Sequence, residues 1–393
     1  MMATFYANDY LYIVMRTACF AIVIILCFYS CSKNNSPAPP VTPPGDTTST
    51  PVTTPIAYRG ADLSFLPEIQ QAGTKFYDST GAKPALDIFK EYGCNLVRVR
   101  LWYQPVNAHS SLDEVLDFCK QISAEGMQIL LDFHMSDTWA DPSHQSTPAT
   151  WAGLAASVLN DSVKAYTQRV LTMLKAQNTL PAIVQVGNEI NAGMLWPSGQ
   201  VNSSTDANWP NFAALVKSGI AGVKAVDTDN KILIMLHYAE TDGAADFFNN
   251  MNAQNVPYDV IGLSYYAWWA EKDLSTIQQQ LTTLAAFNKK IFIAETSYPW
   301  TLQWNDNTNN IVGEANQLIP GYDATPQGQL NYLLQLKKLL AAIPNGRGIG
   351  FCYWEPDWVA FKGPSATDGS NSENLALFDF SNKALPGMQA YNK

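Results

Sequence analysis

Two glutamates stand at the ends of strongly apolar runs, where an unpaired charge is costly to bury. Glu189 lies in VQVGNEIN and Glu295 lies in IFIAETSY. A carboxylate in such a place is a candidate for catalysis, because burial and neighbouring charges adjust its pKa. Two carboxyls roughly 5–5.5 Å apart can cleave a glycosidic bond with retention, one as nucleophile and the other as acid and then base. The spacing alone does not say which glutamate has which part.

Each glutamate taken alone also has an ordinary structural explanation. A glutamate at a strand end often pairs with an arginine, and Arg98 is available as a partner. Two such glutamates on facing strands, each beside aromatic rings, favour catalysis over two separate ion pairs.

Tryptophan is abundant, with 11 in 393 residues, and most of it follows the apolar runs. Nine Trp side chains have this position: Trp102, Trp139, Trp196, Trp268, Trp269, Trp300, Trp304, Trp354 and Trp358. A Trp usually fills a core. Nine at one end of a fold instead favour a groove in which indole faces stack on sugar rings.

Eight short apolar runs predict the strands that must position these residues. The runs are 58–63, 95–102, 127–135, 182–189, 231–238, 258–266, 290–298 and 348–355. Helical patterns between them include 83–93, 112–126, 161–177 and 327–343. Strands that are apolar almost throughout and alternate with helices indicate a parallel sheet covered on both faces. Eight repeats predict an α/β fold, a single (β/α)8 TIM barrel with long loops at its carboxyl-terminal face.

The alternative architecture is an open, doubly wound sheet. No GxGxxG motif and no GxxxxGKS or GxxxxGKT motif follows any run, so the barrel is favoured. Barrel enzymes carry their chemistry at the carboxyl ends of the strands, which is where both glutamates are expected.

Composition excludes several function classes. The formal net charge is −10 and the pI is near 4.9, which argues against a nucleic-acid partner. The presence of only four His and of no HExxH motif argues against a zinc site built from histidines. Cys94, Cys119 and Cys352 are an odd number outside the leader, and no CxxC occurs, so no disulfide framework is predicted.

The N-terminal region predicts export. An apolar run over 17–30 is shorter than the ~20 residues that span a bilayer, so residues 1–30 are predicted to be a signal peptide with its true start at Met15. Ser30 and Cys31 resemble a bacterial lipobox, which predicts lipidation at Cys31. An ordinary cleaved signal peptide and a single membrane anchor are the alternatives.

A proline-rich and threonine-rich segment separates the leader from the barrel. Seven of the 23 prolines lie between Ser32 and Ile56. Such a segment cannot bury a core and behaves as an extended tether. The predicted organisation is therefore a lipidated Cys and linker over 31–56, followed by a catalytic domain over 57–393.

Several long motifs resemble family 53 of the glycoside hydrolases, the endo-β-1,4-galactanases. In chain order they are GADLSFLPEIQQAGTKFYDSTG, NLVRVRLW, LDFHMSDTWADP, VQVGNEINAGMLWP, VIGLSYYAWW and AETSYPWT. The resemblance runs from about Gly60 to Trp358, nearly the whole predicted barrel. It implies a retaining endo-acting hydrolase that needs no cofactor for catalysis.

The resemblance also implies roles for single residues. Glu189 would be the general acid/base, and Glu295 the nucleophile. Asn188 would bind the sugar 2-hydroxyl, Arg98 would hold the nucleophile ionised, and Tyr266 would orient it. His134, Asp137, His237 and Trp354 would line the central subsites. Trp102 and Trp300, two of the tryptophans that follow the apolar runs, are also expected to bind substrate.

The loop after the seventh strand departs from the family pattern. Many bacterial relatives bind calcium there, and Asp306 and Asn310 match two ligands, but Trp304 and Thr308 replace two others. Because calcium takes six to eight oxygens, a solvated polar loop is the alternative.

The leading hypothesis is a monomeric, lipid-anchored endo-β-1,4-galactanase that acts on the galactan side chains of pectin. Another β-glycanase of the same clan, such as a mannanase or cellulase, and a non-catalytic glycan-binding lipoprotein are the alternatives. The lipid would be the only membrane attachment. An outer-membrane lipoprotein at the cell surface is expected, because intact galactan is too large to import, and the periplasmic face is the other possibility.

Overall fold

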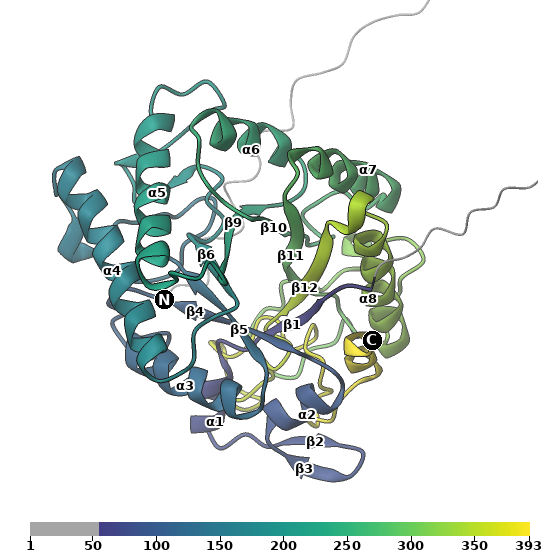
Figure 1. The fold of residues 1–393 in the computed structure, drawn as a ribbon. Coiled ribbons are helices and arrows are strands. Elements are labelled where there is room, and N and C mark those ends of the chain that lie inside the picture. Colours follow the sequence, from purple (N-terminus) through teal and green to yellow (C-terminus); the bar gives the residue numbers. More distant parts are fainter. Residues whose placement is uncertain (1–54) are drawn as a thin grey trace, which may run out of the picture. The chain divides into compact units, whose positions relative to one another are not determined.

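Eight parallel strands close into a barrel in the computed structural model, which describes residues 55–393 (Figure 1). Around the barrel they follow the order β1 (Tyr58–Asp62), β4 (Leu96–Leu101), β5 (Gln128–Phe133), β6 (Ile183–Val186), β9 (Leu233–Ala239), β10 (Val260–Ser264), β11 (Lys290–Thr296) and β12 (Gly348–Trp354). Each predicted apolar run contributes one strand, and the (β/α)8 barrel is confirmed. The predicted signal peptide, Cys31 and nearly all of the linker lie outside the described residues.

Helices surround the barrel (Figure 1). They are α1 (Leu66–Gln71), α2 (Ala85–Glu91), α3 (Leu112–Ala124), α4 (Ala156–Ala176), α5 (Trp209–Val226), α6 (Ala244–Ala253), α7 (Leu274–Leu284) and α8 (Pro326–Ala341). The predicted helical stretches correspond to α2, α3, α4 and α8, although α4 begins at Ala156 rather than at 161. The side chains of Ser111 and Thr325 accept backbone hydrogen bonds at the starts of α3 and α8, which fixes where these helices begin.

The loops contain shorter elements of secondary structure. Two antiparallel ribbons are formed by β2 (Phe76–Asp78) with β3 (Gly81–Lys83) and by β7 (Gly193–Met194) with β8 (Gly199–Gln200). Turns of 3-10 helix cover Ala149–Trp151, Ala285–Phe287, Ala315–Gln317, Pro344–Gly346 and Pro386–Tyr391.

The interior of the barrel is built in two layers. An apolar layer holds one inward side chain from most strands: Leu96, Leu130, Ile183, Met235, Val260, Phe292, Ala294 and Cys352. Inward positions recur every second residue along a strand. Two residues further along, the side chains are Arg98, Asp132, Gln185, His237 and Trp354. The strand period therefore sets a polar layer directly on an apolar floor, facing the carboxyl-terminal rim.

The described cysteines are buried and free, and the prediction of no disulfide framework agrees with this. Cys352 belongs to the apolar layer of the barrel, so it acts there as a small hydrophobic side chain. Within residues 55–393, none of the helices combines the length and apolar composition that a membrane crossing requires.

Candidate active site

The two glutamates reach the same point above the polar layer. In the barrel, β6 and β11 are separated by β9 and β10. One carboxylate oxygen of Glu189, one of Glu295 and a ring nitrogen of His237 lie within 4.8 Å of one another. A separation this small fits a nucleophile and an acid/base, and it is shorter than the ~6.5–9.5 Å that leaves room for an inverting water.

A β-bulge brings Glu295 toward the barrel axis. Along β10 and β11 the register pairs Leu263 with Ile293 but Ser264 with Glu295, so β11 carries one extra residue. That residue is Ala294, which occupies the apolar layer inside the barrel. Strict alternation would point the next side chain outward, and the bulge re-aims it.

Glu189 reaches the site by a different route. Its strand β6 ends at Val186, earlier than predicted, and the chain turns at Gly187, where φ is +88°. A Cβ at Gly187 would lie 2.6 Å from Ile190, so a larger residue would not fit this turn. Glu189 itself has a φ of +46°, a conformation that non-glycine residues adopt only where the surroundings enforce it.

Glu295 is held by a cation and a phenol. Arg98 Nη1 lies 2.9 Å from Oε1, and the Tyr266 hydroxyl donates to Oε2 at 2.8 Å. Burial raises the pKa of Glu295, and the Arg98 charge acts against that rise. These are the two contacts that the resemblance predicts for a nucleophile kept ionised and oriented.

Arg98 is almost fully buried and satisfies its donors within the polar layer. Its Nη1 pairs with Asp62 at 2.6 Å, and its Nη2 reaches Asp132 and Asn188, each at 2.8 Å. A buried guanidinium is stable only with such complete pairing. The fork therefore places Asn188 and Glu295 relative to one another.

Glu189 has no cationic partner among the contacts of the described residues. Its Oε1 accepts a hydrogen bond from the Ser264 hydroxyl at 2.6 Å. Burial, and then the Glu295 charge, raise the pKa of Glu189 well above its usual range. A carboxyl that stays protonated beside an ionised one has the property required of a general acid.

His237 lies behind Glu189 rather than in an open cleft, because its side chain is fully buried. Its Nε2 is 3.0 Å from Ser264 Oγ, and its Nδ1 is 2.9 Å from Asn188 Oδ1. Burial and the Arg98 charge lower the pKa of His237 well below its usual range, so the ring is neutral. Because both ring nitrogens already have partners, His237 supports the glutamates and is not available as a metal ligand.

His134, Asp137 and Asn188 are tied into the structure by several bonds. His134 Nε2 lies 3.0 Å from Asp132, and its Nδ1 accepts from the backbone of Ala140. The Asp137 carboxylate accepts from two backbone N–H groups of neighbouring loops. Asn188 donates to the Ala140 carbonyl. Substrate contact by these residues stays a prediction, and each of them also positions its surroundings.

Aromatic rings line the rim around the two carboxyls. The Arg100 guanidinium lies 4.1 Å from the ring of Trp139 and 4.8 Å from that of Phe65, and Phe65 stacks on Trp358 at 4.0 Å. Trp354 stands between Trp358 and Tyr266: its ring is 5.8 Å from the first and 6.5 Å from the second.

Three indole N–H groups on this rim are buried without a hydrogen-bond partner among the described residues: those of Trp102, Trp268 and Trp358. Unpaired buried donors are costly, and sugar hydroxyls could satisfy them. Trp139, Trp269 and Trp304 are exposed. The predicted gathering of Trp at one end of the barrel is therefore present, with both buried and exposed members.

The sequence analysis missed site residues in four strands. Asp62, Asp132 and Gln185 complete the buried network around Arg98. Ser264 was missed as the partner of Glu189. For Asp132 and Gln185 the available signal was a polar residue at an inward position, two places after the apolar-layer residues Leu130 and Ile183.

Comparison with known proteins adds the family. The sequence profile of glycosyl hydrolase family 53 matches residues 58–391. The chain belongs to glycosyl hydrolase family 53. An arabinogalactan endo-beta-1,4-galactanase of Cellvibrio japonicus is 37% identical over 338 residues, which cover 84% of this chain and 89% of the relative. An endo-beta-1,4-galactanase of Bacillus subtilis is 29% identical and covers 85% of each chain.

Solved structures of the family superpose closely on this barrel. The GH53 catalytic domain of Ignisphaera aggregans aligns with a TM-score of 0.80 at 35% identity, over 88% of this chain and 97% of that domain. A structure of fungal beta-1,4-galactanases aligns with a TM-score of 0.74 at 29% identity, over 86% and 99%. A xylanase catalytic core at 14% identity and a TM-score of 0.52 shares the fold alone.

The family 53 chain brings its loop after β11 against the loop after β12. Asn305, Asp306 and Thr308 of the first loop contact the second loop. The backbone N–H groups of Asn305 and Asp306 donate to Glu373 Oε1, and the Thr308 hydroxyl accepts from the backbone of Gly369. Burial raises the pKa of Glu373 to about 7, and the Asp306 carboxylate adds to the rise. Trp300 also joins these loops, with its indole N–H directed at the Glu373 carbonyl and its ring against Phe380.

Acceptor oxygens are left over between these loops. Within the described part of the chain, Asp306 Oδ2, Asn310 Oδ1, Glu373 Oε2 and Asn374 Oδ1 are buried without hydrogen-bond partners. Thr308 instead bonds to the loop after β12, and Trp304 is exposed. A set of oxygens with two carboxylates is the donor chemistry that calcium prefers. Asp306 and Asn310 are the two calcium ligands that the sequence predicts, and Glu373, which the sequence analysis did not name, is hydrogen-bonded to the backbone of Asp306. Calcium binding stays a prediction.

Proposed function

We propose that this family 53 enzyme hydrolyses internal β-1,4-galactosidic bonds of galactan with retention of configuration. The observation that carries the proposal is the pair Glu189 and Glu295, close together but in opposite electrostatic surroundings. Relatives named as endo-beta-1,4-galactanases support galactan as the substrate.

The reaction proceeds in two displacements. A Glu295 oxygen attacks the anomeric carbon while Glu189 gives its proton to the glycosidic oxygen, so the C–O bond breaks and the leaving sugar departs neutral. Water then attacks the glycosyl-enzyme ester as the Glu189 carboxylate takes its proton. The second step releases Glu295 and restores the proton on Glu189.

Digestion of defined polysaccharides tests this proposal. We expect oligosaccharides from β-1,4-galactan, with β-configured first products by NMR, and none from mannan or carboxymethyl-cellulose. Hydrolysis of the last two instead would favour another β-glycanase. Binding of galactan without any product would favour a non-catalytic lipoprotein.

We also propose that calcium binds between the loops after β11 and β12. Asp306, Asn310 and Glu373 would supply oxygens, and the ion would offset the repulsion of two buried carboxylates and hold the loops together. The melting temperature should fall in EGTA and recover with calcium. Glu373→Gln keeps an oxygen that can accept the backbone hydrogen bonds of Asn305 and Asp306, and it should abolish the response to calcium. The same melting temperature of the native protein in EGTA and in calcium would contradict the site.

For location, we propose a monomeric outer-membrane lipoprotein anchored through Cys31, with the barrel at the cell surface. The lipobox-like Ser30-Cys31 and the proline-rich linker support it. Cys31→Ala should release a soluble protein. Protease added to whole cells should digest the barrel, and full protection until the membrane is broken would place it on the periplasmic side.

A further inference from the structure

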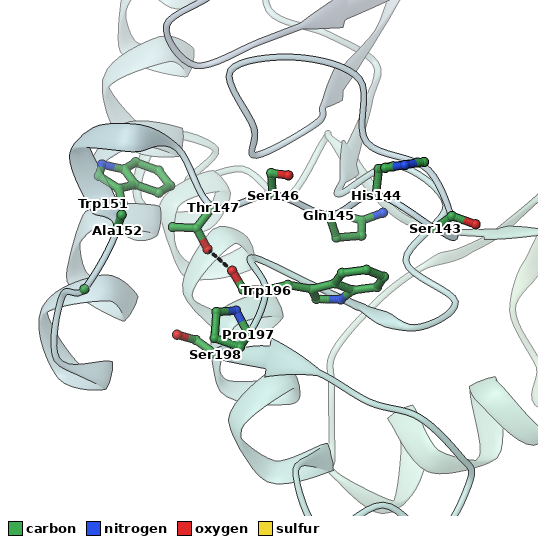
Figure 2. Close-up of a pocket in the computed structure, with 11 residues that line it drawn as sticks. Ser143, His144, Gln145, Ser146, Thr147, Trp151, Ala152, Trp196, Pro197 and Ser198 are labelled. Carbon is green, nitrogen blue, oxygen red and sulfur yellow. Dashed lines mark hydrogen bonds between the residues drawn. The ribbon is translucent and has the colours of Figure 1, made fainter. Parts of the chain in front are cut away.

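A groove with a volume of about 580 Å³ lies between the loop that follows β5 and the loop that follows β6 (Figure 2). Gln145 and Trp151, which are both buried, are among its lining residues, and Trp196 and Pro197 line one side. The volume is within the range of small-molecule sites, which is roughly 300–1,000 Å³. None of these residues has a part in the two displacements described above.

The aromatic side of the groove is held rigidly. The indole N–H of Trp196 donates to the Ala192 carbonyl at 2.8 Å, and its backbone N–H donates to the Gln145 carbonyl at 2.7 Å. The Trp196 carbonyl accepts from the Thr147 hydroxyl at 2.8 Å, the dashed line in Figure 2. A half-buried indole fixed in this way offers a preformed stacking face with little entropy to lose.

The rim of the groove is polar and rich in hydroxyl groups. Ser143, Ser146 and Ser198 are exposed along it, and each hydroxyl can donate and accept. The lining contains no lysine, arginine or carboxylate, and its one titratable side chain, His144, pairs with Asp141. An aromatic side with an uncharged hydroxyl rim fits a neutral sugar rather than an ionic ligand.

Gln145 connects the groove to the acid/base. Its side-chain amide donates to the backbone carbonyls of Asn188 at 2.7 Å and Glu189 at 3.3 Å. Because Glu189 protonates the departing oxygen, the leaving group lies on its side of the site, away from the attack by Glu295. We propose that the groove binds galactosyl units of the leaving group, with Trp196 as their stacking platform. The inference rests on the proposed function.

Filling the groove tests the inference without disturbing the core. Ser146→Trp places an indole on the exposed rim. Ser204→Trp, at an exposed serine between β8 and α5 and outside the groove, is the matched control. We expect kcat/KM on galactan to fall about tenfold with Ser146→Trp and to stay unchanged with the control. A nitrophenyl β-1,4-galactobioside has no leaving sugar, so its hydrolysis should be unaffected. Ser146→Trp should cleave reducing-end-labelled oligosaccharides at different bonds from those that the native enzyme cleaves.

Trp196→Phe, which keeps an apolar ring of smaller area, should give the same pattern more weakly. Equal losses on galactan and on the aryl substrate would mean a structural role and would overturn the inference, as would unchanged cleavage by Ser146→Trp. If the native enzyme does not cleave galactan at all, the proposed function fails instead, and the two failures are thereby distinguished.

Discussion

The two halves of the active site hold chemically identical carboxyls in different ways. Glu295 is bound by the Arg98 cation and the Tyr266 hydroxyl, whereas Glu189 has the neutral Ser264 hydroxyl, with neutral His237 behind it. Both are buried, so burial alone cannot separate their roles. The position of one positive charge makes the difference, since it favours the ionised form of Glu295 and leaves the proton to Glu189.

Loss of the nucleophile should have the largest effect. Glu295→Gln keeps the shape but cannot form the glycosyl-enzyme, so we expect kcat to fall about 10⁵-fold on galactan and on aryl substrates alike. Single-turnover mass spectrometry should find no covalent intermediate. Appreciable turnover of either substrate would break the assignment.

Loss of the acid/base should depend on the substrate. With Glu189→Gln we expect galactan hydrolysis to fall about 10³-fold, because the sugar leaving group needs a proton. A nitrophenyl substrate with a good leaving group should keep its first step and accumulate the glycosyl-enzyme, seen as a burst. If this variant were as inactive as Glu295→Gln in that burst, the two roles would not be separable.

Removal of the Ser264 hydroxyl should shift the pH profile. Glu189 must be protonated for the first step, so kcat/KM is lost as pH rises through its pKa. The Ser264 hydrogen bond favours the ionised form, so Ser264→Ala should raise that pKa and move the alkaline limb to higher pH, with about a tenfold loss of rate.

Ser297→Ala is the matched control for that experiment. Ser297 is a buried serine just after β11 whose hydroxyl has no partner among the described residues. Ser297→Ala should change neither the rate nor the position of the alkaline limb. If kcat/KM of Ser264→Ala were lower by the same factor at every pH, with its alkaline limb unshifted, Ser264 would have only a packing role.

The smallest expected effect concerns stability. A raised pKa means that the folded state holds a proton which the unfolded chain releases above about pH 4.3, so native stability falls as pH rises toward the folded pKa of Glu189. Glu189→Gln does not titrate, and its gain in melting temperature should grow from acid to neutral pH. Glu295→Gln should gain less, because it gives up the Arg98 pair, and thermal melts at several pH values compare the two.

The strands could be predicted because their pattern is local. Each apolar run covers its strand to within one residue, and Glu189 and Glu295 lie near the ends of two of these runs. The networks could not be predicted in the same way. Arg98 contacts Asp62, Asp132 and Asn188, which are 34 to 90 residues away in the chain, and only barrel closure brings them together.

The barrel, the family and the two glutamates can be read from the amino-acid sequence alone, because the period of apolar residues and the long motifs are properties of short stretches. The direction in which those glutamates point depends on the folded barrel. One extra residue in β11 turns Glu295 inward, and a turn at Gly187 carries Glu189 over the polar layer. The tertiary structure also places His237 behind the site and Glu373 beside Asp306. Such contacts join loops that are far apart in the chain, so their geometry depends on packing that no single segment encodes.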